Sequence, residues 1–466
     1  MPARPNFAFI FPDQWRGDCL GSLGHPVVET PFLDEIAASG VTFTAAYSPS
    51  PSCIAARASL ITGQTPSTTG RLGYRDRVPW RYEHTLMRCL RDAGYQTLLT
   101  GKTHFYPQRA SLGFEEMRLY DTQKHEPGYV SDYEAWLEIV ADGQIRDTAK
   151  EISTNSWLAC PWTMPERFHP NTWTMDASID LLQRRDPTRP FFIQIGFHRP
   201  HPPLDPPQRY YERFEAIDLP PAPVGDWASR YDQPPETVNA SSGHLPEKVL
   251  ARTRRAYYAQ LAHIDYQVGR LINWLQQNSL YDDTIIVFSS DHGELLGEHH
   301  LFRKTNPFEG SARIPLIMRV PGSGFTGARR QPVSIIDFMP TFLDFAGVDI
   351  PGTVEGRSLL PLLQDSEAPW RDFVHGEHAP GWQYVTDGRQ KYIWESTSGR
   401  QWFFDLVSDP QETANLIDIS DHNEGISFWR RRLIDVLAQR PDDGLTDGEG
   451  LIAGARLPSV RPELLS

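Results

Sequence analysis

Short apolar segments alternate with amphipathic helical patterns along most of this chain, and this alternation constrains the fold more than any other feature. The first apolar segment, Asn6–Phe11, is typical of a buried strand, and a helix is expected to begin at Thr30-Pro31 and to stop at Gly40. Further strands are expected at 95–100, 191–197, 284–289 and 315–320, and further helices at 84–93, 173–184 and 252–277. Because such βαβ units form parallel sheets covered by helices on both faces, we expect a large, mostly parallel α/β sheet.

The pattern changes near Trp370, where short strand-like runs precede a helical pattern near 427–439. We expect three parts: a large α/β domain at 1–369, a small antiparallel α+β subdomain at 370–440, and a C-terminal tail at 441–466. Residues 121–170 are polar with no clear period, which indicates a lid or an insertion. For the tail, a frayed terminus is the first expectation, and an arm that joins the subunits of a homo-oligomer is the alternative.

The balance of charge excludes several classes of partner. Lys and Arg number 45 and Asp and Glu number 59, which gives a net charge of −14. We therefore expect neither nucleic acid nor an anionic membrane as a partner. The chain has no apolar run of about 18 residues, the length that a membrane-spanning helix needs. It also has no signal peptide pattern, so we expect a soluble cytoplasmic protein unless an export signal precedes it.

Polar and charged side chains follow four of the expected strands. Asp13 comes after the first strand, and similar groups occur at 101–104, 198–203 and 290–292. Open α/β sheets bind their ligands at the carboxyl ends of their strands. We therefore expect one site that collects these four segments.

The stretch Ser52–Gly63 carries the most specific pattern in the chain. It contains Cys53, Ala55 and Arg57 in the order Cys-x-Ala-x-Arg, and it ends in Thr-Gly. This pattern resembles the signature of type I sulfatases, in which the cysteine is oxidised to formylglycine after translation. The resemblance implies that a formylglycine-generating maturation enzyme modifies Cys53, and that the metal-bound hydrate of formylglycine is the nucleophile.

Chemistry favours such a nucleophile independently of the family. A hydroxyl of an aldehyde hydrate on a metal ion can be deprotonated near neutral pH and can attack sulfur or phosphorus in line. The second hydroxyl later expels the sulfate, whereas an ordinary Ser or Cys ester needs external water. Arg57 lies one helical turn beyond Cys53, from where its guanidinium can hold the hydrate or a neighbouring carboxylate. For Cys53 alone, a plain buried thiol at a helix start is the alternative.

Two pairs of residues resemble the metal ligands of the family. Asp13 and Gln14 follow the first strand, and Asp291 and His292 open an Asp-His-Gly run after a later one. The resemblance implies that these four residues, together with the modified Cys53, hold a divalent cation. Oxygen-dominated ligation suits Ca²⁺, with Mg²⁺ or Mn²⁺ as alternatives. For Asp13 alone, a helix cap or an Asx-turn is the alternative.

Cationic and imidazole side chains stand at the remaining strand ends. Lys102 and His104 resemble the family's Lys-x-His element, His201 lies in a Pro-His-x-Pro element, and Lys304 takes the place of a late Lys. The resemblance implies that Lys102 and Lys304 contact the sulfate oxygens. It gives His104 the role of orienting or deprotonating the hydrate, and His201 a contact near the leaving oxygen. Arg199, beside His201, is expected to line the substrate pocket.

The likeness covers most of the chain, and it implies the sandwich fold of the alkaline phosphatase superfamily. Three functions stay open: a sulfatase acting on aryl or carbohydrate sulfate monoesters, a phosphonate or phosphate ester hydrolase on the same scaffold, and a non-catalytic binding protein in which Cys53 stays a thiol. The organic part of the substrate is expected to contact residues 71–80, 121–170 and 376–383.

Overall fold

The computed structural model describes residues 4–121, 128–440 and 443–465. Within these residues the large sheet has eight strands in the order β5-β4-β6-β1-β7-β8-β2-β9. Their bounds are β1 (Asn6–Ile10), β2 (Val41–Phe43), β4 (Gln96–Gly101), β5 (Glu116–Leu119), β6 (Phe191–Gly196), β7 (Thr284–Ser289), β8 (Leu316–Arg319) and β9 (Gly327–Arg329). Only β8 runs antiparallel to its two neighbours in this sheet. The prediction of a large, mostly parallel α/β sheet is confirmed.

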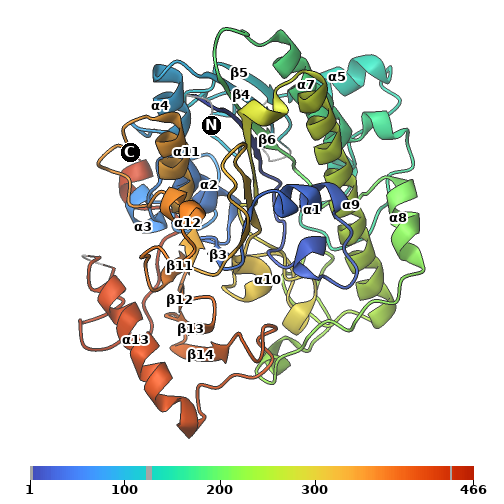
Figure 1. The fold of residues 1–466 in the computed structure, drawn as a ribbon. Helices are drawn as coiled ribbons and strands as arrows, with labels where there is room; N and C mark the ends of the chain where they lie inside the picture. Colours follow the sequence, from blue (N-terminus) through green and yellow to red (C-terminus); the bar gives the residue numbers. More distant parts are fainter. Residues whose placement is uncertain (1–3, 122–127, 441–442, 466) are drawn as a thin grey trace.

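Helices cover both faces of this sheet (Figure 1). One face carries α2 (Cys53–Thr62), α4 (Leu86–Asp92) and α11 (Phe338–Ala346), and the other carries α1 (Pro31–Ala38), α7 (Pro170–Arg184), α8 (Gln208–Glu215) and α9 (Glu247–Gln277). Strand β1 explains why two layers are needed, since Phe7 and Phe9 enter one core while Ala8 and Ile10 enter the other. Successive side chains of a strand point to opposite faces, so an uninterrupted apolar strand must be covered twice.

A separate antiparallel sheet follows in the C-terminal part. It consists of β11 (Val374–His378), β12 (Trp382–Thr386), β13 (Gln390–Glu395) and β14 (Arg400–Asp405), paired in chain order. One face packs on α13 (Asn423–Leu437), and the other packs on Ala45, Tyr47 and Phe308 of the large domain. This arrangement agrees with the expected α+β subdomain, whose limits at 370 and 440 stay a prediction.

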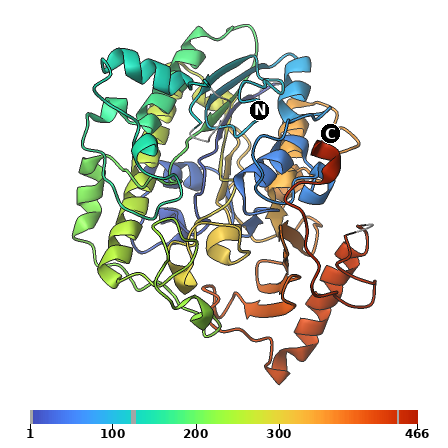
Figure 2. The same cartoon turned by 180° about the vertical axis from the view of Figure 1, so that it is seen from behind.

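The segment after α13 folds back onto the large domain, as Figure 2 shows (dark red). The amides of Leu72 and Gly73 both donate to the carbonyl of Ser459 at 3.0 Å, and the amide of Arg461 donates to Gly70 at 2.8 Å. Val460 is buried there. The expectation of a frayed tail is therefore wrong for residues 443–465, because these residues complete the packing of their own chain. A contact with a second subunit stays a prediction.

The polar segment 121–170 is more regular than its sequence indicates. In its described part it contains α5 (Asp132–Val140), which starts at a capping box formed by Ser131 and Glu134, and α6 (Thr148–Glu151). An aromatic cluster that includes Tyr133 and Trp162 fastens it to the large domain. The segment lacks an obvious period because aromatic side chains, rather than an aliphatic stripe, form its buried face.

Short elements complete the structure: α3 (Pro66–Thr69), α10 (Glu309–Ala312), α12 (Leu360–Gln364) and the paired strands β3 (Ala46–Tyr47) and β10 (Val333–Ser334). Among the residues described, no helix combines the length and the apolar character needed to cross a bilayer.

Candidate active site

The carboxyl ends of four neighbouring parallel strands bring the predicted segments together. Strands β4, β6, β1 and β7 are adjacent, so the residues that follow them meet at one edge of the sheet. Two links hold this edge: the amide of Asp13 donates to Phe197 at 2.9 Å, and the amide of His201 donates to Asp13 at 3.2 Å. The side chains gathered there are almost completely buried: Asp13, Gln14, Lys102, His104, His201, Asp291 and His292.

Cys53 is the first residue of α2, and this places its sulfur over the strand ends. The Sγ atom lies 3.6 Å from Asp13 Oδ1, 3.2 Å from His292 Nε2 and 3.3 Å from Lys304 Nζ. The side chain is 1% exposed, and burial, with Asp13 beside it, raises the pKa of the thiol to about 11. An unmodified thiol is therefore protonated at neutral pH, and in that form it is a poor nucleophile.

Four side chains have the chemistry and the spacing of a cation site. One ligand atom from each of Asp13, Cys53, Asp291 and His292 lies within 4.8 Å of the others. His292 Nδ1 is 2.9 Å from the carbonyl of Gly293, and donating to it leaves the Nε2 lone pair directed at the cluster. Burial lowers the pKa of His292, which favours the neutral form that binds metals. The donor set fits a divalent cation.

Gln14 completes this set through the orientation of its amide. Its Nε2 donates to the carboxylate of Glu294, so its Oε1 faces Lys304 Nζ at 2.7 Å. Carbonyl-type oxygens of this kind suit hard divalent cations. Glu294 thereby decides which end of the Gln14 amide is presented to the cluster.

Two cationic side chains contact the carboxylates of Asp13 and Asp291. Lys102 Nζ forms an ion pair with Asp13, and Arg57 Nε donates to Asp291 Oδ2 at 2.9 Å. Arg57 also donates to the backbone carbonyl of Lys102 at 3.2 Å, so it links α2 to the residue that follows β4. Burial alone would lower the pKa of Lys102, and the charge of Asp13 raises it above the usual value. Of the two partners predicted for Arg57, the structure shows the carboxylate.

Two imidazoles retain acceptor or donor positions for a ligand. His104 is buried, and within the described part of the chain neither of its ring nitrogens has a hydrogen-bond partner. Burial lowers its pKa, and Lys102 and Arg57 lower it further, so the ring is neutral at neutral pH. His201 Nδ1 lies 2.8 Å from the carbonyl of Pro202, which leaves Nε2 for a ligand. A buried polar ring with no partner is rare without a function.

A pocket of about 330 Å³ opens directly above Cys53. Among the described residues its lining consists of Ser52, Cys53, Tyr74, Asn155, His201, Ser241, Arg303, Lys304 and Thr305. The sulfur at position 53, one imidazole and one ammonium group therefore face a space large enough for a small organic molecule.

Comparison with known proteins agrees with this geometry. The family model described as Sulfatase matches residues 5–348, and the model described as N-sulphoglucosamine sulphohydrolase, C-terminal, matches residues 297–439. The chain belongs to the sulfatase family. It is a sulfuric ester hydrolase with the fold of the alkaline phosphatase superfamily.

Relatives of this sulfatase match along nearly its whole length. The arylsulfatase of Clostridium perfringens is 40% identical over 98% of this chain and 99% of its own, and the choline-sulfatase of Rhizobium meliloti is 30% identical over 89% and 83%. The crystal structure of the phosphonate monoester hydrolase of Agrobacterium radiobacter superposes with a TM-score of 0.80 at 26% identity, covering 98% of this chain and 100% of that one.

Arg199 does not lie where we expected a substrate-binding residue. Its guanidinium is fully buried and makes two bonds to Asp205, at 2.7 and 2.8 Å, and one to the hydroxyl of Tyr120 at 3.0 Å. It is not among the residues that line the pocket. Because its guanidinium donates to these buried acceptors, Arg199 stabilises the loop after β6 and does not face the pocket.

The sequence predicts only some of the residues that line the pocket or support the site. Two segments expected to carry specificity contribute Tyr74 and Asn155, whereas residues 376–383 contribute none. Arg303, Ser241 and the amide-orienting Glu294 were missed. The signal for Glu294 was present, since it is an acid three residues after Asp291, but charged residues in loops are usually exposed.

Replacing Glu294 by glutamine tests its role on Gln14. The new amide group opposes the amide of Gln14, so Gln14 turns its oxygen away from the cation site. We expect the affinity of the site for a divalent cation to fall about 10- to 100-fold, the range seen when a ligand loses its supporting hydrogen bond. Metal titration followed by activity and by thermal melting measures this.

The matched control is the double variant Gln14→Glu with Glu294→Gln. It restores one hydrogen bond across the pair, with donor and acceptor exchanged, and returns an oxygen to the site. Recovery of cation affinity is expected, and an unchanged affinity in the single variant would contradict the proposed role.

Proposed function

We propose that this sulfatase cleaves the S–O bond of a sulfate monoester of an aryl or carbohydrate group, with the hydrate of formylglycine at position 53 as the nucleophile. The observation that carries the proposal is the position of Cys53 Sγ, which contacts Asp13, His292 and Lys304 at once. Formylglycine, when hydrated, supplies one hydroxyl that attacks sulfur and a second whose deprotonation releases the sulfate.

A divalent cation fits the residues at the strand ends. Asp13, Gln14, Asp291 and His292 would hold it next to position 53, with Ca²⁺ as our first choice and Mg²⁺ or Mn²⁺ as alternatives. When bound, it would lower the pKa of the attacking hydroxyl and offset negative charge on the sulfate. Arg57 keeps the carboxylate of Asp291 in a fixed orientation through their 2.9 Å hydrogen bond.

The remaining side chains bind the sulfate and move protons. Lys102 and Lys304 place ammonium groups 3.9 and 3.3 Å from the sulfur of Cys53, where they stabilise charge on the transferring group. His104, with neutral ring nitrogens, accepts the proton of the hydrate. His201 lines the pocket and donates a proton to the leaving oxygen once the sulfate anion has favoured its protonated form. These assignments are proposals from position and chemistry.

The burial of Cys53 bears on when the modification occurs. A side chain that is 1% exposed, at the start of a helix that is buried along its whole length, is out of reach of another enzyme. We therefore propose that the maturation enzyme oxidises Cys53 before this part of the chain folds.

A phosphonate ester hydrolase is the second candidate, and the similarity to the Agrobacterium radiobacter structure favours it. Values of kcat/KM for a 4-nitrophenyl sulfate and the matching phosphonate monoester separate the two. We expect the sulfate to be preferred by about tenfold or more, or 1.4 kcal/mol in transition-state stabilisation. A higher value on the phosphonate would reject the sulfatase assignment. The Cys53→Ala variant is the control, because both activities must vanish if one site performs them.

A further inference from the structure

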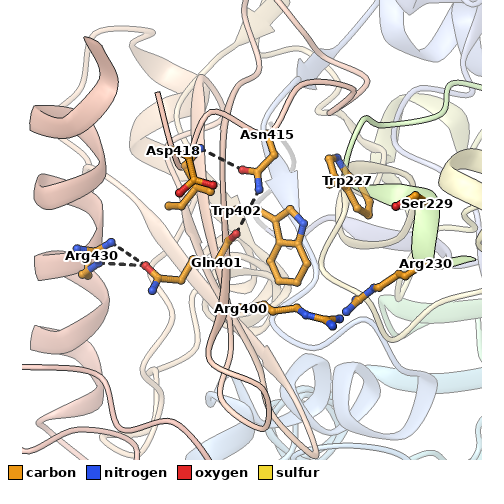
Figure 3. A pocket seen from close by; sticks show the side chains of 10 residues that line it. Trp227, Ser229, Arg230, Arg400, Gln401, Trp402, Asn415, Asp418 and Arg430 are labelled. Carbon is orange, nitrogen blue, oxygen red and sulfur yellow. Dashed lines mark hydrogen bonds between the residues drawn. The ribbon is translucent and has the colours of Figure 1, made fainter. Parts of the chain in front are cut away.

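A second hollow, of about 560 Å³, lies between the C-terminal sheet and the 3-10 helix Ala228–Tyr231 (Figure 3). It shares no lining residue with the pocket above Cys53. Its wall contains three arginines, two tryptophans and one acid; the lining residues are Trp227, Ser229, Arg230, Arg400, Gln401, Trp402, Asn415, Ile417, Asp418 and Arg430.

The three arginines are poorly neutralised. Within the described residues, the side chain of Arg400 has no hydrogen bond or ion pair, and Arg430 donates to Gln401 Oε1 at 2.7 Å and to the hydroxyl of Tyr392 at 3.3 Å but to no carboxylate. Arg230 has one distant acid, Glu395 at 3.8 Å, and its buried Nε has no partner in the described chain. The hollow therefore has an excess of positive charge.

The orientation of the arginine side chains concentrates the excess positive charge at one place in the hollow. The guanidinium ends of Arg230 and Arg400 point toward one another beneath Trp402 (Figure 3). Like charges that face each other repel unless an anion lies between them. The chain as a whole has a net charge of −14, so a cationic hollow is contrary to its general surface and indicates a specific ligand.

We propose that this hollow binds a saccharide through an anionic group, a sulfate or a carboxylate, held between Arg230 and Arg400. Guanidinium groups match the planar or tetrahedral oxygens of such anions through paired hydrogen bonds. The volume lies in the range of roughly 300–1,000 Å³ typical of pockets for small organic molecules, which exceeds the need of a bare anion. The amide of Gln401 and the hydroxyl of Ser229 supply groups suited to sugar hydroxyls.

Equilibrium binding to the full chain tests the site, with a sulfated disaccharide, an unsulfated uronate disaccharide, a neutral disaccharide and inorganic sulfate as probes. The protein carries Cys53→Ala so that no probe is hydrolysed. We expect Arg400→Glu to weaken binding of an anionic disaccharide about tenfold or more, as the loss of a charge-assisted hydrogen bond predicts. Arg330→Glu, the same charge change at another exposed arginine, is expected to leave binding unchanged.

Each other outcome overturns the assignment. Equal binding by the Cys53→Ala chain with and without Arg400→Glu would contradict a site at this hollow. Equal binding of the neutral disaccharide would contradict the role of the anionic group. If inorganic sulfate binds as tightly as the disaccharides, the site recognises the anion alone, and a saccharide ligand is contradicted. The Arg400→Glu variant is also made in the chain that retains Cys53. Its kcat on a small aryl sulfate is expected to stay unchanged, and this would show that the variant folds. The result does not depend on the proposed function of the Cys53 site.

Discussion

Replacing Cys53 by alanine is expected to lower kcat for an aryl sulfate by at least about 10⁴-fold, because loss of the nucleophile removes the covalent route entirely. The change removes one buried sulfur and should leave the fold intact, so thermal melting is expected to stay near that of the wild type. Steady-state kinetics at saturating substrate measures the loss.

Two further measurements make this result specific. Cys89→Ala is the matched control, since Cys89 is a partly buried cysteine outside the site, and it is expected to keep full activity. Mass analysis of the wild-type peptide spanning residue 53 is expected to show an aldehyde in place of the thiol. If residue 53 is a thiol in every molecule of an active preparation, formylglycine is not the nucleophile. An intact thiol in a preparation without activity would favour the non-catalytic alternative.

Removal of the divalent cation is expected to lower kcat/KM on the order of 10³-fold, because the buried carboxylates of Asp13 and Asp291 then lose the cation that they hold and the hydroxyl would lose its activation. The midpoint of thermal unfolding should fall as well, since a cation that binds only the native state stabilises it. Dialysis against a chelator, followed by separate additions of Ca²⁺, Mg²⁺ and Mn²⁺, measures both effects and ranks the ions.

The matched control for the cation uses a second group of potential ligands, Asp232, His244 and His300, whose ligand atoms lie within 4.8 Å of one another. Asp232 lies 2.7 Å from His244 and is exposed, so Asp232→Asn should change neither the activity nor its dependence on the cation. Full activity in protein from which all divalent metal has been removed would contradict the proposed role of the four ligands.

Much of the fold could be predicted because its physical cause is local. Strand β7 occupies Thr284–Ser289 as predicted, since six consecutive residues there are buried and turn residues precede them. The short edge strands β5 and β9 were missed, because three or four partly exposed residues carry no readable alternation.

The amino-acid sequence by itself determined the family, the parallel sheet and the set of residues that meet around Cys53, because each of these follows from short motifs at the ends of apolar strands. The tertiary structure alone decided the partners of each charge. It pairs Arg57 with Asp291, orients the Gln14 amide through Glu294, and places Arg230 and Arg400 at one hollow. Ion pairs and pockets depend on distances between segments far apart in the chain, which no local pattern encodes.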